Sequence, residues 1–149
     1  MEIERKYLLD ALPDNLEQYP HKKIEQGYLS TDPVVRVRRS DYSYYLTYKS
    51  EGLMIREEYN LPLTEESYEH LKQKADGILL SKTRYCIPLS SDLTIELDVF
   101  DAPYEGLYLA EVEFPDKESA EKFVPPAWFG KDVTFSTDYH NSTLSQKKL

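Results

Sequence analysis

Charged side chains of a single sign recur two residues apart in several segments of the chain. The cationic pairs are Arg36 with Arg38 and Lys82 with Arg84, and the carboxylate pairs are Glu96 with Asp98 and Glu111 with Glu113. Like charges at this spacing repel one another unless an opposite charge lies between them. Paired cations suit phosphate oxygens, and paired carboxylates suit hard divalent ions such as Mg²⁺ or Mn²⁺. The pattern therefore predicts a site for a polyanion that a divalent metal ion links to carboxylates.

Further charged residues extend the same two sets. They are Glu2, Glu4 and Lys6 on one face of the N-terminal segment, Lys49, and Arg56 with Glu58. Solvent-exposed faces usually intersperse the two signs, whereas here the cationic pairs come mostly early in the chain and the carboxylate pairs late. This separation favours one shared interior site over a set of solvated surfaces.

Strands must carry these side chains, because polarity alternates with a period of two wherever they occur. The predicted strands are residues 2–8, 23–29, 34–39, 44–49, 55–61, 79–85, 94–100 and 108–114. An antiparallel sheet ordinarily buries its apolar face. If the sheet instead closes with its charged face inward, it forms a barrel with a charged lumen and an apolar outer surface.

Helices are expected to cover that outer surface. Thr64 is an N-cap candidate for a helix over residues 65–75, and Asp116 opens a second over residues 117–123, which the following prolines end. Shorter helices are expected within residues 12–19 and near the C-terminus. We expect Tyr68, Leu71 and Phe123 to cover the outward residues of 95–99 and 108–114. The fold class is thus α+β, a closed eight-stranded antiparallel barrel with helices packed outside, in a single domain of residues 1–149.

Composition narrows the classes of function. The net charge of −9 has the wrong sign for a protein that binds nucleic acid or an anionic membrane. The single cysteine, Cys86, rules out an intrachain disulfide framework and a cysteine-rich zinc site. No apolar stretch is long enough to cross a membrane. These features predict a cytoplasmic protein.

The charged motifs also occur in a recognisable order along the chain. That order is Glu2-Ile3-Glu4-Arg5-Lys6, Gln26-Gly27-Tyr28-Leu29, Arg36-Val37-Arg38, Lys49-Ser50-Glu51-Gly52, Arg56-Glu57-Glu58-Tyr59, Lys82-Thr83-Arg84-Tyr85, Glu96-Leu97-Asp98-Val99-Phe100 and Glu111-Val112-Glu113-Phe114. It resembles the CYTH superfamily, the triphosphate tunnel metalloenzymes, over nearly the full length. The chain looks most similar to short bacterial members that hydrolyse inorganic triphosphate.

The resemblance implies an eight-stranded tunnel that binds a triphosphate and Mg²⁺ or Mn²⁺. It implies metal ligation by Glu2, Glu4, Glu111 and Glu113, with Asp98 and Glu58 nearby. It implies phosphate binding by Lys6, Arg36, Arg38, Lys49, Arg56, Lys82 and Arg84. One departure is Tyr139-His140-Asn141, where similar chains often carry a basic residue beside the tyrosine.

Two residues have a further candidate role in catalysis. Lys82 would act as a general base if neighbouring cations lower its pKa, with Tyr28 orienting it; otherwise Lys82 binds phosphate as a cation. His21, His70 and His140 lack metal-ligand spacing and are expected to be solvated or to pack structurally.

Three functions remain open on the sequence alone. The leading hypothesis is hydrolysis of inorganic triphosphate to pyrophosphate and phosphate. The second is an organic triphosphatase, acting on thiamine triphosphate or a nucleoside triphosphate, or a class IV adenylate cyclase on the same tunnel. The third is a non-catalytic module that binds polyphosphate or nucleotides. The substrate is a small molecule in each case, and the oligomeric state, a homodimer being one option, stays open.

Overall fold

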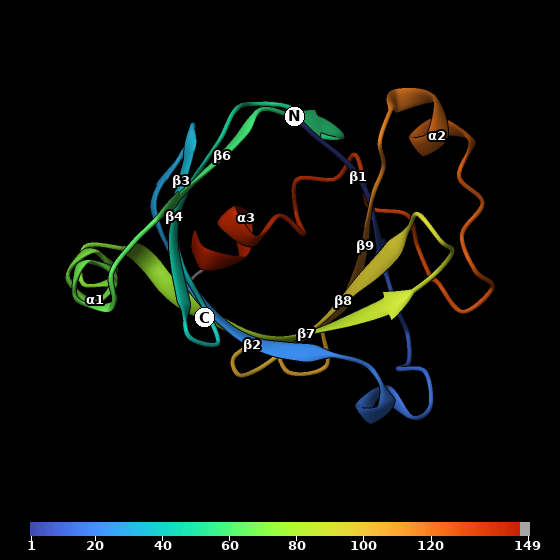
Figure 1. Cartoon of the computed structure of the whole chain (residues 1–149), viewed down its shortest axis with the longest axis horizontal. Helices are drawn as coiled ribbons and strands as arrows, with labels where there is room; N and C mark the ends of the chain where they lie inside the picture. Colours follow the sequence, from blue (N-terminus) through green and yellow to red (C-terminus); the bar gives the residue numbers. More distant parts are fainter. Residues whose placement is uncertain (147–149) are drawn as a thin grey trace.

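A single antiparallel sheet curls around a central space in the computed structural model, which describes residues 1–146 (Figure 1). The strands are β1 (Glu2–Leu8), β2 (His21–Thr31), β3 (Val34–Ser40), β4 (Ser43–Lys49), β5 (Ile55–Arg56), β6 (Glu58–Pro62), β7 (Asp76–Pro88), β8 (Thr94–Phe100) and β9 (Tyr108–Glu113). Their order is β5-β1-β9-β8-β7-β2-β3-β4-β6. The predicted sheet of alternating strands is confirmed. No helix within residues 1–146 has the length and apolar character needed to cross a membrane.

The two edge strands, β5 and β6, are consecutive in sequence and are separated only by Glu57. β5 pairs with β1, whereas β6 pairs with β4, so the chain itself joins the two edges of the sheet. The Glu57 N–H donates to Ser50 Oγ (2.8 Å), and its carbonyl accepts from the Ser50 N–H (3.0 Å). Residues 55–61 were expected as one strand; the change of partner at Glu57 makes them two. This split explains why nine strands are found where eight were predicted.

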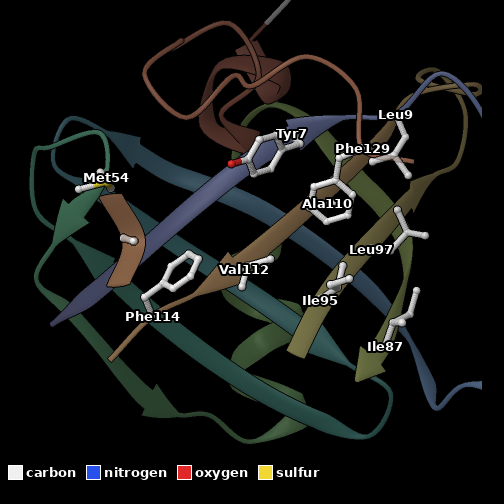
Figure 2. Packing of buried hydrophobic residues seen from close by; sticks show 11 residues of the cluster. Tyr7, Leu9, Met54, Ile87, Ile95, Leu97, Ala110, Val112, Phe114 and Phe129 are labelled. Atoms are coloured by element: carbon white, nitrogen blue, oxygen red, sulfur yellow. The ribbon is translucent and has the colours of Figure 1, made fainter. Parts of the chain in front are cut away.

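The outer face of β1, β8 and β9 carries the larger apolar core (Figure 2). Ile95, Leu97, Ala110 and Val112 are at most 1% exposed, as expected from the alternation. Phe123 follows α2 (Lys117–Lys122), and its ring lies 5.1 Å from that of Phe114. The predicted cover of this face by Phe123 is confirmed.

Helix α1 (Glu65–Lys72) lies elsewhere on the outer surface. Its predicted cap is confirmed, since the Ser67 N–H donates to Thr64 Oγ1 (3.0 Å). The helix packs on β3 and β4, where the ring of Tyr68 lies 5.3 Å from that of Tyr44. The prediction that Tyr68 and Leu71 cover β8 and β9 is wrong, because α1 directly follows β6, which lies beside β4. The helix expected within residues 12–19 is a short 3₁₀ turn, η1 (Leu16–Gln18).

The C-terminal helix α3 (Asn141–Gln146) lies inside the ring rather than outside it (Figure 1). It contacts β2 and β7, and Leu144 packs with inward-facing Leu80, Phe100 and Leu109. Helices were expected only on the outside, so this part of the prediction is wrong. Each of these three residues lies two positions along its strand from a charged inward residue, namely Lys82, Asp98 or Glu111. The inward face of each strand therefore changes from charged to apolar along its length. We call this apolar cluster with α3 the plug.

Candidate active site

The charged inward faces enclose a cavity of about 410 Å³, here called the chamber. All of the predicted site residues except Asp98 line it. They are Glu2, Glu4, Lys6, Tyr28, Arg36, Arg38, Lys49, Arg56, Glu58, Lys82, Arg84, Glu111 and Glu113. The structure therefore brings residues from both ends of the chain into one polar space.

One side of the chamber, here called the open wall, carries Arg36 and Arg38 on β3. Arg36 is only 6% exposed, and its Nε has no hydrogen-bond partner among the described residues. Arg38 donates from Nε to Gln26 Oε1 (2.8 Å), a neutral acceptor. Burial, together with Arg36 and Arg84, lowers the pKa of Arg38 to about 9. Within residues 1–146 neither guanidinium has a carboxylate partner, so this wall holds positive charge that a bound anion can neutralise.

A neighbouring part of the lining, here called the paired wall, carries Lys82 and Arg84 on β7, which β2 separates from β3. Arg84 forms a two-pronged contact with Asp98 of β8, at 2.7 Å and 2.9 Å, and the Lys82 ammonium lies 2.7 Å from the same carboxylate. Burial alone would raise the pKa of Asp98, but Arg84 and Lys82 lower it overall. Burial, opposed by Asp98, lowers the pKa of Lys82 to about 7.

Asp98 itself is fully buried and does not reach the chamber surface. Its two oxygens are taken by Arg84 and Lys82. Binding a metal ion would cost Asp98 these contacts, and its place in the metal-binding set stays a prediction. Asp98 holds both cations in place from behind.

Two further carboxylates share Lys49 at the rim of the chamber. The Lys49 ammonium lies 3.0 Å from Glu2 Oε1 and 3.4 Å from Glu58 Oε2. Burial and the neighbouring Glu4 raise the pKa of Glu2 to about 8, whereas contact with Glu2 and Lys49 lowers that of Glu58 to about 2 against the effect of burial. One lysine therefore does not fully compensate the two carboxylates.

Glu4 and Glu113 lie directly opposite one another on β1 and β9. Neither belongs to an ion pair within residues 1–146, whereas neighbouring Glu111 pairs with Lys6 at 3.5 Å. Burial and Glu111 raise the pKa of Glu4 to about 7, and burial also raises that of Glu113. Facing carboxylates without a cation destabilise a sheet, and hard oxygen donors are what Mg²⁺ or Mn²⁺ prefers. By donor type these residues fit a divalent ion.

The carboxylates are not gathered into a finished metal site. Among residues 1–146, no three His, Cys, Asp or Glu side chains converge closely enough to hold an ion. The donor set is present, but side chains must rotate to assemble it. Rotation is available to glutamates, which have three side-chain torsions.

Two residues to which the sequence analysis gave no role in the site also belong to it. Gln26 of β2 and Asn141 of α3 are buried, and Asn141 Oδ1 accepts from Lys82 Nζ (2.8 Å) and from Gln26 Nε2 (2.8 Å). The expected contact of Tyr28 with Lys82 is not among the hydrogen bonds within residues 1–146; the Tyr28 hydroxyl lies 3.4 Å from Gln26 Nε2. Gln26 could have been found from its position two residues before Tyr28. Nothing in the sequence places Asn141 inside a sheet.

His140 also lines the chamber. It follows Tyr139, at the position where similar chains often carry a basic residue. Burial, together with Lys6 and Arg56, lowers its pKa to about 4, so it is neutral near pH 7. The neutral imidazole adds no charge to the site.

The nearly closed antiparallel sheet with a charged interior matches the triphosphate tunnel fold. The model of the CYTH domain matches residues 1–146, and the chain belongs to that family. Membership of this family implies dependence on a divalent metal ion.

Two curated relatives and one solved structure that resemble this chain are named inorganic triphosphatases. An inorganic triphosphatase of Nitrosomonas europaea is 39% identical, covering 97% of this chain and 96% of its own length. An inorganic triphosphatase of Acetivibrio thermocellus is 36% identical, covering 96% of this chain and 92% of its own length. A crystal structure of an inorganic triphosphatase superposes with a TM-score of 0.73 at 36% identity, covering 99% of this chain and 96% of the other.

Proposed function

We propose that this protein hydrolyses inorganic triphosphate to pyrophosphate and phosphate inside the chamber. The observation that carries the proposal is the charge left uncompensated on the two sides of one cavity. Arg36 and Arg38 have no carboxylate partner, and Glu4 and Glu113 have no cationic partner, within the described residues. A triphosphate anion with a divalent cation complements both sets. The names of the relatives support the same substrate.

The chain's own residues supply mainly binding and orientation, as phosphoryl transfer requires. Arg36, Arg38 and Arg84 suit fork-shaped contacts with phosphate oxygens, and Lys6 and Lys49 act as point charges. We assign Glu4 and Glu113, with Glu2, Glu58 and Glu111 around them, to hold Mg²⁺ or Mn²⁺. When bound, such an ion supplies charge neutralisation on phosphate oxygens and polarises water.

In the reaction, a water oxygen forms a bond to a terminal phosphorus while the bond from that phosphorus to its bridging oxygen breaks. Pyrophosphate leaves with the electron pair of that bond, and the water gives up a proton. Lys82 has two candidate roles here, a charged ligand of the phosphate or a neutral base for that proton. Its lowered pKa makes the neutral form accessible near pH 7.

The Lys82→Arg variant separates the two roles, because arginine keeps the charge but does not give up its proton. A variant that keeps measurable turnover supports phosphate binding. A variant that binds triphosphate but has lost turnover supports the base. Triphosphate binding therefore has to be measured alongside activity.

The plug bears on the choice of substrate. It fills the interior at Leu80, Phe100 and Leu109 with apolar side chains and α3. An organic group attached to the triphosphate would therefore have to extend from the chamber on another side. Solved neighbours that are named putative adenylate cyclases are under 25% identical and share only the fold.

A phosphate-release panel tests the proposal. Inorganic triphosphate, ATP, thiamine triphosphate and long polyphosphate are each assayed with Mg²⁺ and with Mn²⁺. We expect the highest kcat/KM for inorganic triphosphate, and no turnover in the matched variant Glu4→Gln. Faster release from an organic triphosphate would overturn the substrate assignment. Tight binding of triphosphate without release under any ion would indicate a non-catalytic module.

A further inference from the structure

The first residue of α3 carries a side chain into the floor of the chamber. Asn141 is 8% exposed, and its Oδ1 is a shared acceptor for Lys82 of β7 and Gln26 of β2. The other end of the Gln26 side chain, Oε1, accepts from Arg38 Nε at 2.8 Å. A continuous chain of hydrogen bonds therefore runs from the paired wall through Asn141 and Gln26 to the open wall.

The Lys82 ammonium has two acceptors, the Asp98 carboxylate and the Asn141 amide oxygen. Arg84 and Arg38 lie close enough to lower its pKa, which shows that the three cations repel one another. Asp98 compensates Lys82 from behind, and Asn141 provides a second acceptor at 2.8 Å without adding negative charge. A neutral amide thus fixes the ammonium while leaving the positive potential available to a phosphate.

The position of Asn141 is set by the plug. Leu144 is 1% exposed, and its carbonyl accepts from the Tyr104 hydroxyl at 2.6 Å. Gly77 of β7 approaches the same turn so closely that a Cβ there would lie 2.0 Å from the Ser145 carbonyl oxygen. These contacts lock α3 against the inner sheet face and leave Asn141 little freedom.

We propose that Asn141 is a positioning residue for phosphate binding, acting directly on Lys82 and, through Gln26, on Arg38. The inference rests on the proposed function, since it concerns the same chamber. It gives the plug a second role, which is to carry the acceptor that aligns cations from two strands. Asn141 acts through these cations and not on the substrate itself.

The first test measures triphosphate binding by calorimetry in a metal chelator, so that hydrolysis does not contribute. Loss of the shared acceptor in Asn141→Ala is expected to weaken binding about tenfold, the equivalent of one charge-assisted hydrogen bond. The matched control is Ser145→Ala on the same helix, whose hydroxyl donates to the Ser142 carbonyl instead. It should bind as the wild type does. Thermal melts establish that each variant is folded.

The second test is a double-mutant cycle. Gln26→Ala alone should also weaken triphosphate binding. Once Asn141 is alanine, the further change Gln26→Ala should add less than about twofold, because the Gln26 amide that contacts Arg38 has already lost the acceptor that orients it. Independent residues would instead multiply their separate losses. Multiplied losses, or unchanged binding in folded Asn141→Ala, would overturn the inference.

Steady-state kinetics with Mg²⁺ separate this inference from the proposed function. A misaligned Lys82 should lower kcat of Asn141→Ala beyond the rise in KM, whereas loosening of the helix alone should affect Asn141→Ala and Ser145→Ala equally. An active wild type with an unchanged Asn141→Ala variant overturns the inference alone. A wild type that neither binds nor hydrolyses triphosphate overturns the proposed function, and the inference with it.

Discussion

The open wall and the paired wall each carry two cationic residues at the same spacing, but the charges of the two pairs are compensated differently. Arg36 and Arg38 have no carboxylate partner within residues 1–146, whereas Lys82 and Arg84 share the buried carboxylate of Asp98. The difference separates two uses of buried charge. Cations with a carboxylate partner stabilise the sheet as well as facing the chamber, whereas the whole charge of Arg36 and Arg38 is left for a ligand.

Strand register explains the difference. On the paired wall, β8 places Asp98 directly opposite Arg84. On the open wall, β2 places Gln26 opposite Arg38 and Tyr28 opposite Arg36, both neutral. The position of a charge in its own strand therefore says less about its role than the residue across from it.

The largest expected effect is on the paired wall. Asp98→Ala removes the only carboxylate that pairs with Lys82 within residues 1–146 and leaves Arg84 with Glu96 at 3.2 Å, so it should lower the free energy of unfolding by about 3–5 kcal/mol. Urea denaturation measures this loss. A loss below about 1 kcal/mol would contradict the view that this wall stabilises the fold.

The pH dependence of stability should come largely from the carboxylates that lack a full cationic partner. In metal-free protein the pKa of Glu2 is raised to about 8 and that of Glu4 to about 7, so the folded state binds more protons than the unfolded state above pH 4.5. These two groups make stability fall as pH rises from 4.5 to 8, by up to about 1.4 kcal/mol per pH unit each, whereas the lowered pKa values of His140 (about 4) and Lys82 (about 7) oppose the fall below pH 6.5 and above pH 7. A net decrease in stability is therefore expected between pH 4.5 and 7.

Urea denaturation in chelator across that pH window tests this expectation. The slope should be shallower in Glu4→Gln, which removes one titrating group. Added Mg²⁺ should restore stability near pH 8, since a cation favours the charged carboxylates. A stability that rises steadily with pH in chelator would show that these carboxylates are compensated in the folded protein.

On the open wall the expected effect falls on binding rather than on stability. Arg36→Ala should weaken triphosphate binding by about 1.5–3 kcal/mol, the value of hydrogen bonds to a charged group. The melting temperature of the free protein should not fall, because no ion pair is lost. Arg39→Ala is the control on the same strand, since that side chain is exposed and bonds to the Asp41 carbonyl. If the two substitutions weaken triphosphate binding equally, the buried position of Arg36 in the chamber has no special role in binding.

The smallest effect is expected at Tyr28, between the walls. Its hydroxyl lies 3.4 Å from Gln26 Nε2, a long contact. Tyr28→Phe should therefore change kcat/KM for triphosphate by less than about threefold, or roughly 0.5 kcal/mol. A large loss of kcat with unchanged KM would instead support the predicted role of Tyr28 in orienting Lys82.

The charged residues of the two walls could be predicted from the sequence, whereas the position of the plug inside the sheet could not. The inward charged faces followed from period-two alternation combined with segregated signs, and these signals persist along whole strands. At Leu80 and Phe100 the same strand faces become apolar. The alternation in sequence does not reveal that a helix covers these two residues from inside the sheet. Asn141 was missed because α3 is six residues long and carries no periodic signal. The partner change at Glu57 was missed because pairing depends on strands distant in sequence.

The junction at Glu57 has a consequence for association between molecules. Unpaired backbone N–H and C=O groups on an edge strand can form hydrogen bonds with the edge strand of another molecule. Here the two edges meet at one residue, and the strands that form them are two and five residues long. The second of them ends in Pro62, which has no N–H to donate. We expect the sheet to resist strand addition and the amyloid-like growth that follows from it.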